Sequence, residues 1–203
     1  MPEFFLYADI LGIIAFSISG FLIAIKNKLD ILGILIASTL TALGGGVLRD
    51  TILSNTPFAF SSFYPAATVV STLSIIFLFK LYKKPSIERQ WIFVISDTVG
   101  LVAFSITGAI LAINAEYNFF GIVILSFITA VGGGVIRDIM INQVPSVLIS
   151  DFYGSIAVIA AVVLGVLNMF SLLNELSILC VAIFCVALRL LAVRLKWHLP
   201  TLN

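Results

Sequence analysis

Charged residues are scarce in this chain. Only 10% of its 203 residues are Asp, Glu, Lys or Arg, 61% are hydrophobic, and the formal net charge is +1. A soluble domain carries about 25% charged residues, so this sequence has too little polar surface to cover a water-soluble globule. The near-neutral balance also provides no basic field for binding nucleic acid. The composition therefore predicts an integral membrane protein.

Residues that carry enzyme chemistry are equally few. His198 is the only histidine, and the two cysteines, Cys180 and Cys185, lie on one apolar segment at a spacing that would point them in different directions on a helix. The sequence has no phosphate-binding glycine loop, no nucleophile–histidine set and no metal-ligand spacing. We therefore predict no enzyme activity, no cofactor and no resident metal ion. Because the N-terminus lacks a basic region, the first apolar segment is interpreted as a permanent span rather than a removed signal peptide.

Long apolar runs are what the chain has instead. A membrane-spanning helix needs about 20 mostly apolar residues. Seven segments meet this requirement, and short loops join them into a single membrane domain over residues 1–203. The sequence thus predicts an all-α integral membrane protein with seven transmembrane helices, at residues 4–25, 31–53, 63–82, 91–113, 119–141, 152–170 and 175–195.

The first six segments form an internal repeat. When residues 9–60 are aligned with residues 97–148, 88 positions later, 22 of the 52 pairs are identical. Repeat one covers residues 4–82, repeat two covers residues 91–170, and the additional helix is 175–195. Because each repeat has an odd number of spans, the second must enter the membrane from the opposite side. Two inverted three-helix repeats are predicted, a layout common in transport proteins.

The positions of the basic residues give an independent topology. In a seven-span chain, the nine basic residues outside the repeated motif fall on one face of the membrane: Lys26, Lys28, Lys80, Lys83, Lys84, Arg89, Arg189, Arg194 and Lys196. The loops on the other face contain only acidic charges. By the positive-inside rule, the C-terminus is cytoplasmic and the N-terminus lies outside. We expect a multi-pass protein of the cell (inner) membrane, surrounded by membrane lipid.

One motif occurs once in each repeat. Gly-Gly-Gly-Val-Leu-Arg-Asp at residues 44–50 returns as Gly-Gly-Gly-Val-Ile-Arg-Asp at residues 132–138. Each glycine costs about 1 kcal/mol against alanine in a helix, so the triplets must serve another purpose. They either allow helices to cross closely, or they break or kink the helix and free backbone groups for water or an ion. We favour the second interpretation, with these glycines at the kinks: Gly44, Gly45, Gly46, Gly132, Gly133 and Gly134.

Charges gather beside these motifs. In the inverted topology Asp9 lies on the same membrane face as Arg49 and Asp50, and Asp97, Arg137 and Asp138 form a matching trio on the other face. Adjacent Arg and Asp residues on a helix are not expected to face one another. We therefore predict that each arginine reaches across to the aspartate of another helix, Arg49 to Asp9 and Arg137 to Asp97.

A stripe of small and hydroxyl-bearing residues follows each of these aspartates. It includes Ser17 in the first repeat, with Ser105 and Thr107 in the second. Such a stripe is typical either of helix packing or of the lining of a pore. The sequence leaves both interpretations open.

Two inverted three-span halves, each carrying this motif and followed by a seventh span, resemble the prokaryotic members of the trimeric intracellular cation (TRIC) channel family. The resemblance covers about residues 4–195. The resemblance implies a homotrimer with one pore in each protomer. That pore would pass monovalent cations, mainly K⁺, in transient contact only. The two glycine triplets would be its kinks, and Arg49, Asp50, Arg137 and Asp138 would flank the conduction path.

Two other functions remain open. Inverted repeats with broken helices are as typical of secondary transporters as of channels, so the alternative is transport of a small solute such as glycine. A non-transporting scaffold does not explain why both repeats carry intramembrane Arg and Asp.

Overall fold

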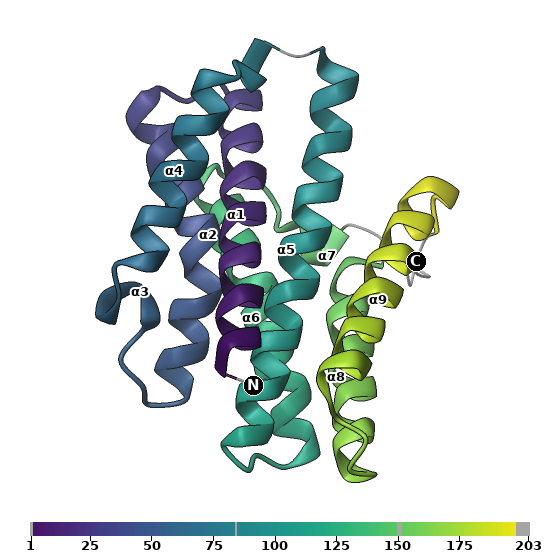
Figure 1. Cartoon of the computed structure of the whole chain (residues 1–203). Coiled ribbons are helices and arrows are strands. Elements are labelled where there is room, and N and C mark those ends of the chain that lie inside the picture. Colours follow the sequence, from purple (N-terminus) through teal and green to yellow (C-terminus); the bar gives the residue numbers. More distant parts are fainter. Residues whose placement is uncertain (1, 84, 150–151, 198–203) are drawn as a thin grey trace.

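Helices form most of the chain (Figure 1). The computed structural model describes residues 2–83, 85–149 and 152–197, with only the backbone for residues 2–4. Lys84 and His198 lie outside the described residues. The helices in chain order are α1 (Pro2–Lys26), α2 (Ile31–Ile52), α3 (Phe58–Ser61), α4 (Tyr64–Leu78), the 3₁₀ turn η1 (Leu81–Lys83), α5 (Ser86–Asn114), α6 (Phe119–Met140), α7 (Ser146–Ile149), α8 (Tyr153–Met169) and α9 (Glu175–Leu195).

Five of these helices, α1, α2, α5, α6 and α9, are long and apolar enough to cross a membrane. The prediction of an all-helical membrane protein is confirmed. At 1.5 Å per residue, α4 with 15 residues and α8 with 17 are about 22 and 26 Å long, shorter than the hydrocarbon core of about 30 Å. The sequence did not predict the four-residue helices α3 and α7, each of which directly precedes one of these shorter helices.

Matching local signals set the helix ends in the two halves. The side chain of Asp30 accepts a hydrogen bond from the backbone N–H of Gly33 at the start of α2, and Asn118 accepts one from Gly121 at the start of α6. Each fills one of the donors that a helix N-terminus leaves unpaired. The N-terminus of α9 has a reciprocal capping box between Asn174 and Ser177.

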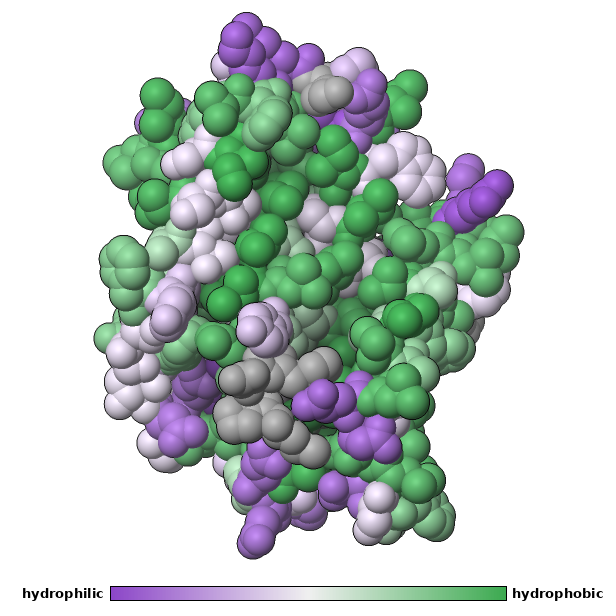
Figure 2. Space-filling view, viewed as in Figure 1, coloured by the Kyte–Doolittle hydropathy of each residue, from purple (hydrophilic) through white to green (hydrophobic). Residues whose placement is uncertain are grey.

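The first two helices of each half, α1 and α2 in the first and α5 and α6 in the second, meet at the centre of the bundle. Helix α1 packs along α5 and α2 along α6, while α4 covers α1, and α8 and α9 cover α5. Helix α5 is the most enclosed element, with 15 buried residues. Figure 2 shows hydrophobic side chains across the middle of the viewed face and hydrophilic ones gathered towards its ends, as a membrane-embedded surface requires.

Both glycine triplets lie inside unbroken helix. Helices α2 and α6 continue through residues 44–46 and 132–134, so the predicted break is wrong, whereas a kink within the continuous helix stays a prediction. The helices instead cross closely. A Cβ on Gly45 would overlap the carbonyl oxygen of Thr129, and a Cβ on Gly133 would overlap that of Thr41. The triplets thus allow the two helix backbones to approach closely.

Candidate functional site: two buried Arg-Asp clusters

The first site is the Asp9 cluster, formed by Asp9 on α1 with Arg49 and Asp50 on α2. The Nη1 of Arg49 donates to Asp9 Oδ1 at 2.6 Å and its Nη2 donates to Asp9 Oδ2 at 3.1 Å, which makes a bidentate ion pair. Its Nε donates to Asp50 Oδ1 at 2.8 Å. The predicted pairing of Arg49 with Asp9 is confirmed.

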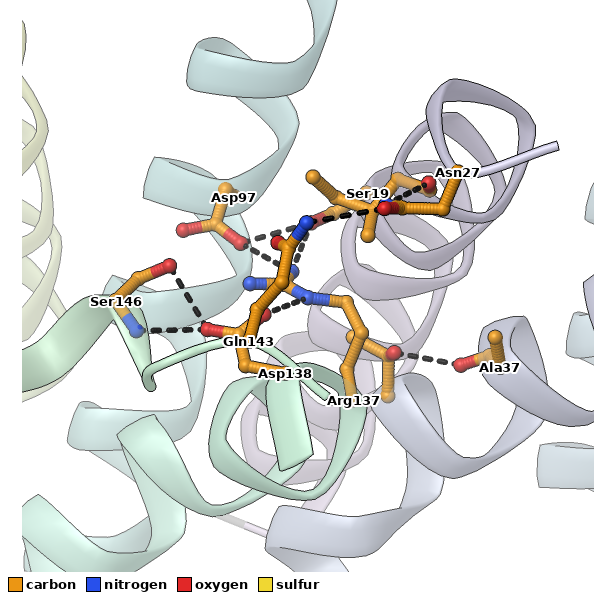
Figure 3. A network of polar contacts seen from close by, with 10 residues as sticks. Ser19, Asn27, Ala37, Asp97, Arg137, Asp138, Gln143 and Ser146 are labelled. Carbon is orange, nitrogen blue, oxygen red and sulfur yellow. Dashed lines mark hydrogen bonds and ion pairs between the residues drawn. The ribbon is translucent and has the colours of Figure 1, made fainter. Parts of the chain in front are cut away.

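The second site is the Asp97 cluster, formed by Asp97 on α5 with Arg137 and Asp138 on α6 (Figure 3). Arg137 Nη1 donates to Asp97 Oδ1 at 3.0 Å, and Nε donates to Asp138 Oδ1 at 2.8 Å. The predicted partner is again confirmed. In both clusters, however, the arginine also contacts the aspartate next to it. The expectation that neighbouring Arg and Asp do not face one another is wrong, because the long guanidinium side chain folds back to reach its neighbour.

Each cluster also takes a hydroxyl from the opposite half of the chain. Arg49 Nη1 lies 3.2 Å from the Oγ1 of Thr107 on α5. Arg137 Nη1 donates to the Oγ of Ser19 on α1 at 2.7 Å, and that hydroxyl donates to Asp97 Oδ1 at 2.7 Å. Ser19 and Thr107 occupy equivalent positions in the repeat. Neither cluster is complete within its own half.

The second carboxylate oxygen, Oδ2, of Asp50 and of Asp138 accepts a hydrogen bond from the start of the short helix that follows. Asp50 Oδ2 accepts from the backbone N–H of Phe58 at 2.8 Å, at the start of α3. Asp138 Oδ2 accepts from the N–H and the hydroxyl of Ser146, at the start of α7, at 2.7 and 2.8 Å. The arginine network is thereby bonded directly to the segment that leaves each motif helix, which explains why α3 and α7 begin where they do.

Both guanidinium groups are shielded from solvent. Arg49 is 1% exposed and Arg137 is 0% exposed, and the aromatic rings of Phe5 and Phe93 lie 5.1 and 5.4 Å from the respective guanidinium carbons. Each cluster has one guanidinium and two carboxylates, a formal charge of −1. Buried charges are stable only when they are paired and hydrogen-bonded, and these clusters satisfy that condition with several partners each.

A pair of aromatic rings lies between the two clusters. Asp9 and Ser19, which mark the two clusters on α1, are ten residues apart, equivalent to about 15 Å along the helix. Between them the rings of Phe16 and Phe104 meet edge to face, with centroids 5.3 Å apart. Phe16 occupies the space that a Cβ on Gly100 would need, and Phe104 does the same at Gly12. The glycines thus let the two rings enter the α1–α5 contact.

The predicted hydroxyl stripe faces this interior. Ser17, Ser105 and Thr107 are fully buried. Ser105 donates to the carbonyl of Val102 at 3.2 Å, but the Ser17 hydroxyl has no hydrogen-bond partner in the described part of the chain. An unpaired buried hydroxyl is unusual and costs free energy of folding. Ser17 directly follows Phe16 in the chain.

The cavities beside the clusters differ in size. A void of about 10 Å³, room for a single water molecule, reaches Asp9, Arg49 and Gly46. A much larger cavity of about 360 Å³ reaches Asp97 and is lined also by Tyr153 and Arg189.

Sequence reasoning missed Tyr153 and Arg189. Arg189 counted only as a charge near the end of the seventh span, whereas the structure places it inside α9, 8% exposed, with its guanidinium carbon 5.2 Å from the Tyr153 ring centre. Its signal was an arginine within an apolar segment. Tyr153 stands where the first repeat has Pro65, and this departure from the repeat was the only indication of its role.

Solved structures share this arrangement of helices. The chain superposes on a TRIC cation channel with a TM-score of 0.84 and 35% identity, covering 97% of this chain and 96% of the other. A prokaryotic TRIC channel crystallised in 0.5 M KCl gives a TM-score of 0.87 with 28% identity, covering 98% and 100% of the two chains. The fold therefore defines a multi-pass membrane protein of the TRIC class.

Sequence comparison leads to the same class. The inner membrane protein YadS of Escherichia coli (strain K12) is 33% identical over 196 residues, 96% of this chain and 94% of YadS. A family model described as "Glycine transporter" matches residues 6–80 and 94–169, one stretch in each half. The chain belongs to this family, which is that of the prokaryotic TRIC channels.

Proposed function

We propose that this protein is a monovalent cation channel, permeable to K⁺, with one pore inside each protomer. The observation that carries the proposal is the pair of Arg-Asp clusters, about 15 Å apart along α1 and each built from both halves of the chain. A cation entering from either side meets a cluster of formal charge −1 before it reaches the aromatic pair. The likeness to solved TRIC cation channels supports the same function.

The described conformation has the features of a closed pore. The Phe16–Phe104 pair and the contacts of Gly45 and Gly133 fill the space between the clusters. A narrow apolar constriction prevents ion passage because water leaves it. Opening would separate α2 from α6 at the glycine triplets, which act as the hinge points of the pore, and would expose Ser17, Ser105 and Thr107 to the path.

Gating would act through the Arg-Asp contacts. Arg49 holds Asp9 and Arg137 holds Asp97, so each arginine ties a motif helix to a helix of the central α1–α5 pair. Release of an arginine frees the motif helix and gives the passing cation a carboxylate partner. Asp50 and Asp138 would transmit this movement to α3 and α7, whose first N–H groups they bind.

The proposed topology is an inverted repeat with seven crossings. The halves make reciprocal contacts, Gly12 with Phe104 and Gly100 with Phe16, as a two-fold relation between them requires. The shorter α4 and α8 would complete their crossings together with α3 and α7. The α1–α2 and α4–α5 connections lie at one end of the bundle (Figure 1), and Lys28, Lys80 and Lys83 lie in them, which supports a cytoplasmic C-terminus and an outside N-terminus.

The assembly would be a homotrimer in the cell membrane, in contact with lipid on its outer surface. The prokaryotic relatives with solved structures belong to the trimeric channel class, including one from Rhodobacter sphaeroides at 25% identity. Since each pore lies within a protomer, trimer formation would stabilise the channel without contributing residues to the conduction path.

Planar-bilayer recording of the purified protein in asymmetric KCl tests the function. A cation channel gives discrete current steps that reverse near the K⁺ equilibrium potential. Reversal near the Cl⁻ potential, or the absence of current steps from a well-folded trimer, would refute the proposal. Arg137→Lys is the matched variant, because it keeps the charge but loses the two-directional hydrogen bonding of the guanidinium.

A second candidate, a secondary transporter of glycine, is favoured by the description of the matching family model. In that case the same clusters would open alternately to the two sides of the membrane. Saturable uptake of labelled glycine into proteoliposomes, without current steps, would replace the channel proposal by this one.

A further inference from the structure

The Asp97 cluster is bonded less completely than the Asp9 cluster, although the two are built from equivalent residues. Arg49 contacts both carboxylate oxygens of Asp9, at 2.6 and 3.1 Å. Arg137 contacts only Oδ1 of Asp97, at 3.0 Å, and Ser19 donates to that same oxygen at 2.7 Å. A bidentate ion pair is stronger and better fixed in its geometry than a single contact. The ion pair of the Asp97 cluster is therefore the weaker of the two.

The second carboxylate oxygen of Asp97 can accept a further hydrogen bond. Among the residues that the structure describes, Oδ2 takes part in none, since both contacts to the carboxylate are made at Oδ1. Figure 3 shows this second oxygen turned away from Ser19 and Arg137. An ionised carboxylate has about four acceptor positions on its two oxygens, so a new donor at Oδ2 need not displace the Ser19 hydroxyl.

A buried donor without a partner lies beside this carboxylate. Tyr153 is 3% exposed, and its Oη makes no hydrogen bond within the described part of the chain. The hydroxyl is close enough to Asp97 for the two groups to interact. A Cβ on Gly134 would lie 3.3 Å from this hydroxyl and 3.7 Å from Nη2 of Arg137. The tyrosine hydroxyl and the arginine thus border the same glycine of α6, next to the carboxylate.

The first repeat has no equivalent donor. Pro65 stands at the position of Tyr153, and its side chain has no hydrogen-bonding group. A buried hydroxyl without a partner costs free energy in the described conformation. That cost is explained if a second conformation of the protein pairs the hydroxyl. Opening of the pore supplies such a conformation, because it releases Arg137 from Asp97.

We propose that Tyr153 is a positioning residue for gating, whose hydroxyl donates to Asp97 Oδ2 when the pore opens. This inference rests on the proposed function. In the closed state Arg137 and Ser19 hold Asp97, and in the open state the tyrosine hydroxyl replaces the departed guanidinium. A new hydrogen bond offsets part of the cost of leaving a buried carboxylate without its cation. The Asp97 cluster would therefore open more readily than the Asp9 cluster, which has no such replacement.

Bilayer recording of Tyr153→Phe tests the role of the hydroxyl, which is the only group that this substitution removes. Open probability should fall about 2- to 12-fold, the worth of one hydrogen bond, with the single-channel current unchanged. Tyr64→Phe is the matched control at an exposed tyrosine and should change neither quantity. An open probability of Tyr153→Phe equal to that of the wild type would overturn the proposal.

Ser19→Ala gives a comparison in the opposite direction. Both Ser19 and Tyr153 place a hydroxyl at the Asp97 carboxylate, but the contacts of Ser19 with Asp97 and Arg137 belong to the closed state. Its removal should raise open probability about 2- to 12-fold, whereas removal of the tyrosine hydroxyl lowers it. Changes of the same sign in both variants would mean that the two hydroxyls stabilise the same state, and would overturn the proposal.

Unfolding in mixed detergent–SDS micelles tests the resting state without any current measurement. Tyr153→Phe loses no hydrogen bond of the closed state, so the SDS fraction at its unfolding midpoint should be unchanged or higher. A lower midpoint would show that the hydroxyl is already paired at rest, which contradicts the proposal. A wild-type protein without current steps overturns the proposed function and this inference with it. A conducting wild type with an equally active Tyr153→Phe variant overturns this inference alone.

Discussion

Adjacent glycines in the first triplet should respond in opposite ways to alanine. A Cβ at Gly45 would overlap the backbone carbonyl of Thr129 on α6, whereas at Gly46 the nearest atom is the Arg49 Nη2 at 3.8 Å. Both positions lie in continuous helix, so the two substitutions change helix propensity and unfolded-state entropy alike. The difference between them isolates the close approach of α2 to α6.

The magnitudes follow from these contacts. Alanine gains about 1 kcal/mol over glycine inside a helix, so Gly46→Ala should be neutral or stabilising by up to that amount. At Gly45 the obstructing atom is backbone, which cannot rotate away, and overpacking costs about 1–3 kcal/mol or more. Because the gain in helix propensity is common to both substitutions, we expect Gly45→Ala to be about 1–3 kcal/mol less stable than Gly46→Ala.

Equilibrium unfolding in mixed detergent–SDS micelles, followed by circular dichroism, measures this difference. Gly133→Ala repeats the obstructed substitution in the second half, where the Cβ would overlap the carbonyl of Thr41; Gly134 is a less open position than Gly46, because its Cβ would lie 3.3 Å from the Tyr153 hydroxyl. If Gly45→Ala unfolds at the same SDS fraction as Gly46→Ala, the backbones do not approach as described, and the explanation of the triplets by close crossing fails.

Four further substitutions test the site and the scaffold. Arg137→Ala should destabilise the protein by about 3–5 kcal/mol, because it leaves buried carboxylates unpaired, and should alter channel open probability; unchanged gating in a folded trimer would contradict the gating role. Phe16→Ala should raise open probability in bilayer recordings by removing half of the ring pair, and an unaltered closed time would argue against that constriction. Thr107→Val should weaken the Asp9 cluster by about 1 kcal/mol through loss of the 3.2 Å contact to Arg49, measured by unfolding; no change would show that this contact contributes nothing. Asn174→Ala should cost about 1 kcal/mol of stability with normal conductance, because it removes only the cap of α9; altered single-channel current would tie α9 to the pore.

Hydropathy and the internal repeat together predicted most of the helix bounds. The ends of α2, α6 and α9 match the predicted segments within one residue, because these apolar runs are bounded by polar residues. The sequence did not predict α3 and α7. These helices depend on the carboxylates of Asp50 and Asp138, whose contact with the following segment is a tertiary feature without periodicity of its own.

The candidate site could be predicted to the extent that it repeats. Equivalent positions in the two halves were enough to pair Arg49 with Asp9 and Arg137 with Asp97. Tyr153 and Arg189 were not predicted as site residues, because neither has an identical residue at the equivalent position of the other repeat. The glycine triplets were misjudged for a different reason: glycine permits both a broken helix and a close crossing, and only the partner surface decides between them.

The exchange of hydroxyls between the halves constrains how such a chain could arise. Arg49 relies on Thr107, and Arg137 relies on Ser19. If the halves descend from one shorter gene, its product would have gained this hydroxyl contact to its buried arginine only by meeting a second molecule inserted upside down. Fusion would then have fixed inside one polypeptide an antiparallel pairing that separate subunits once had to find by chance, and each half would since have been bound to accept only those changes that its opposite tolerates.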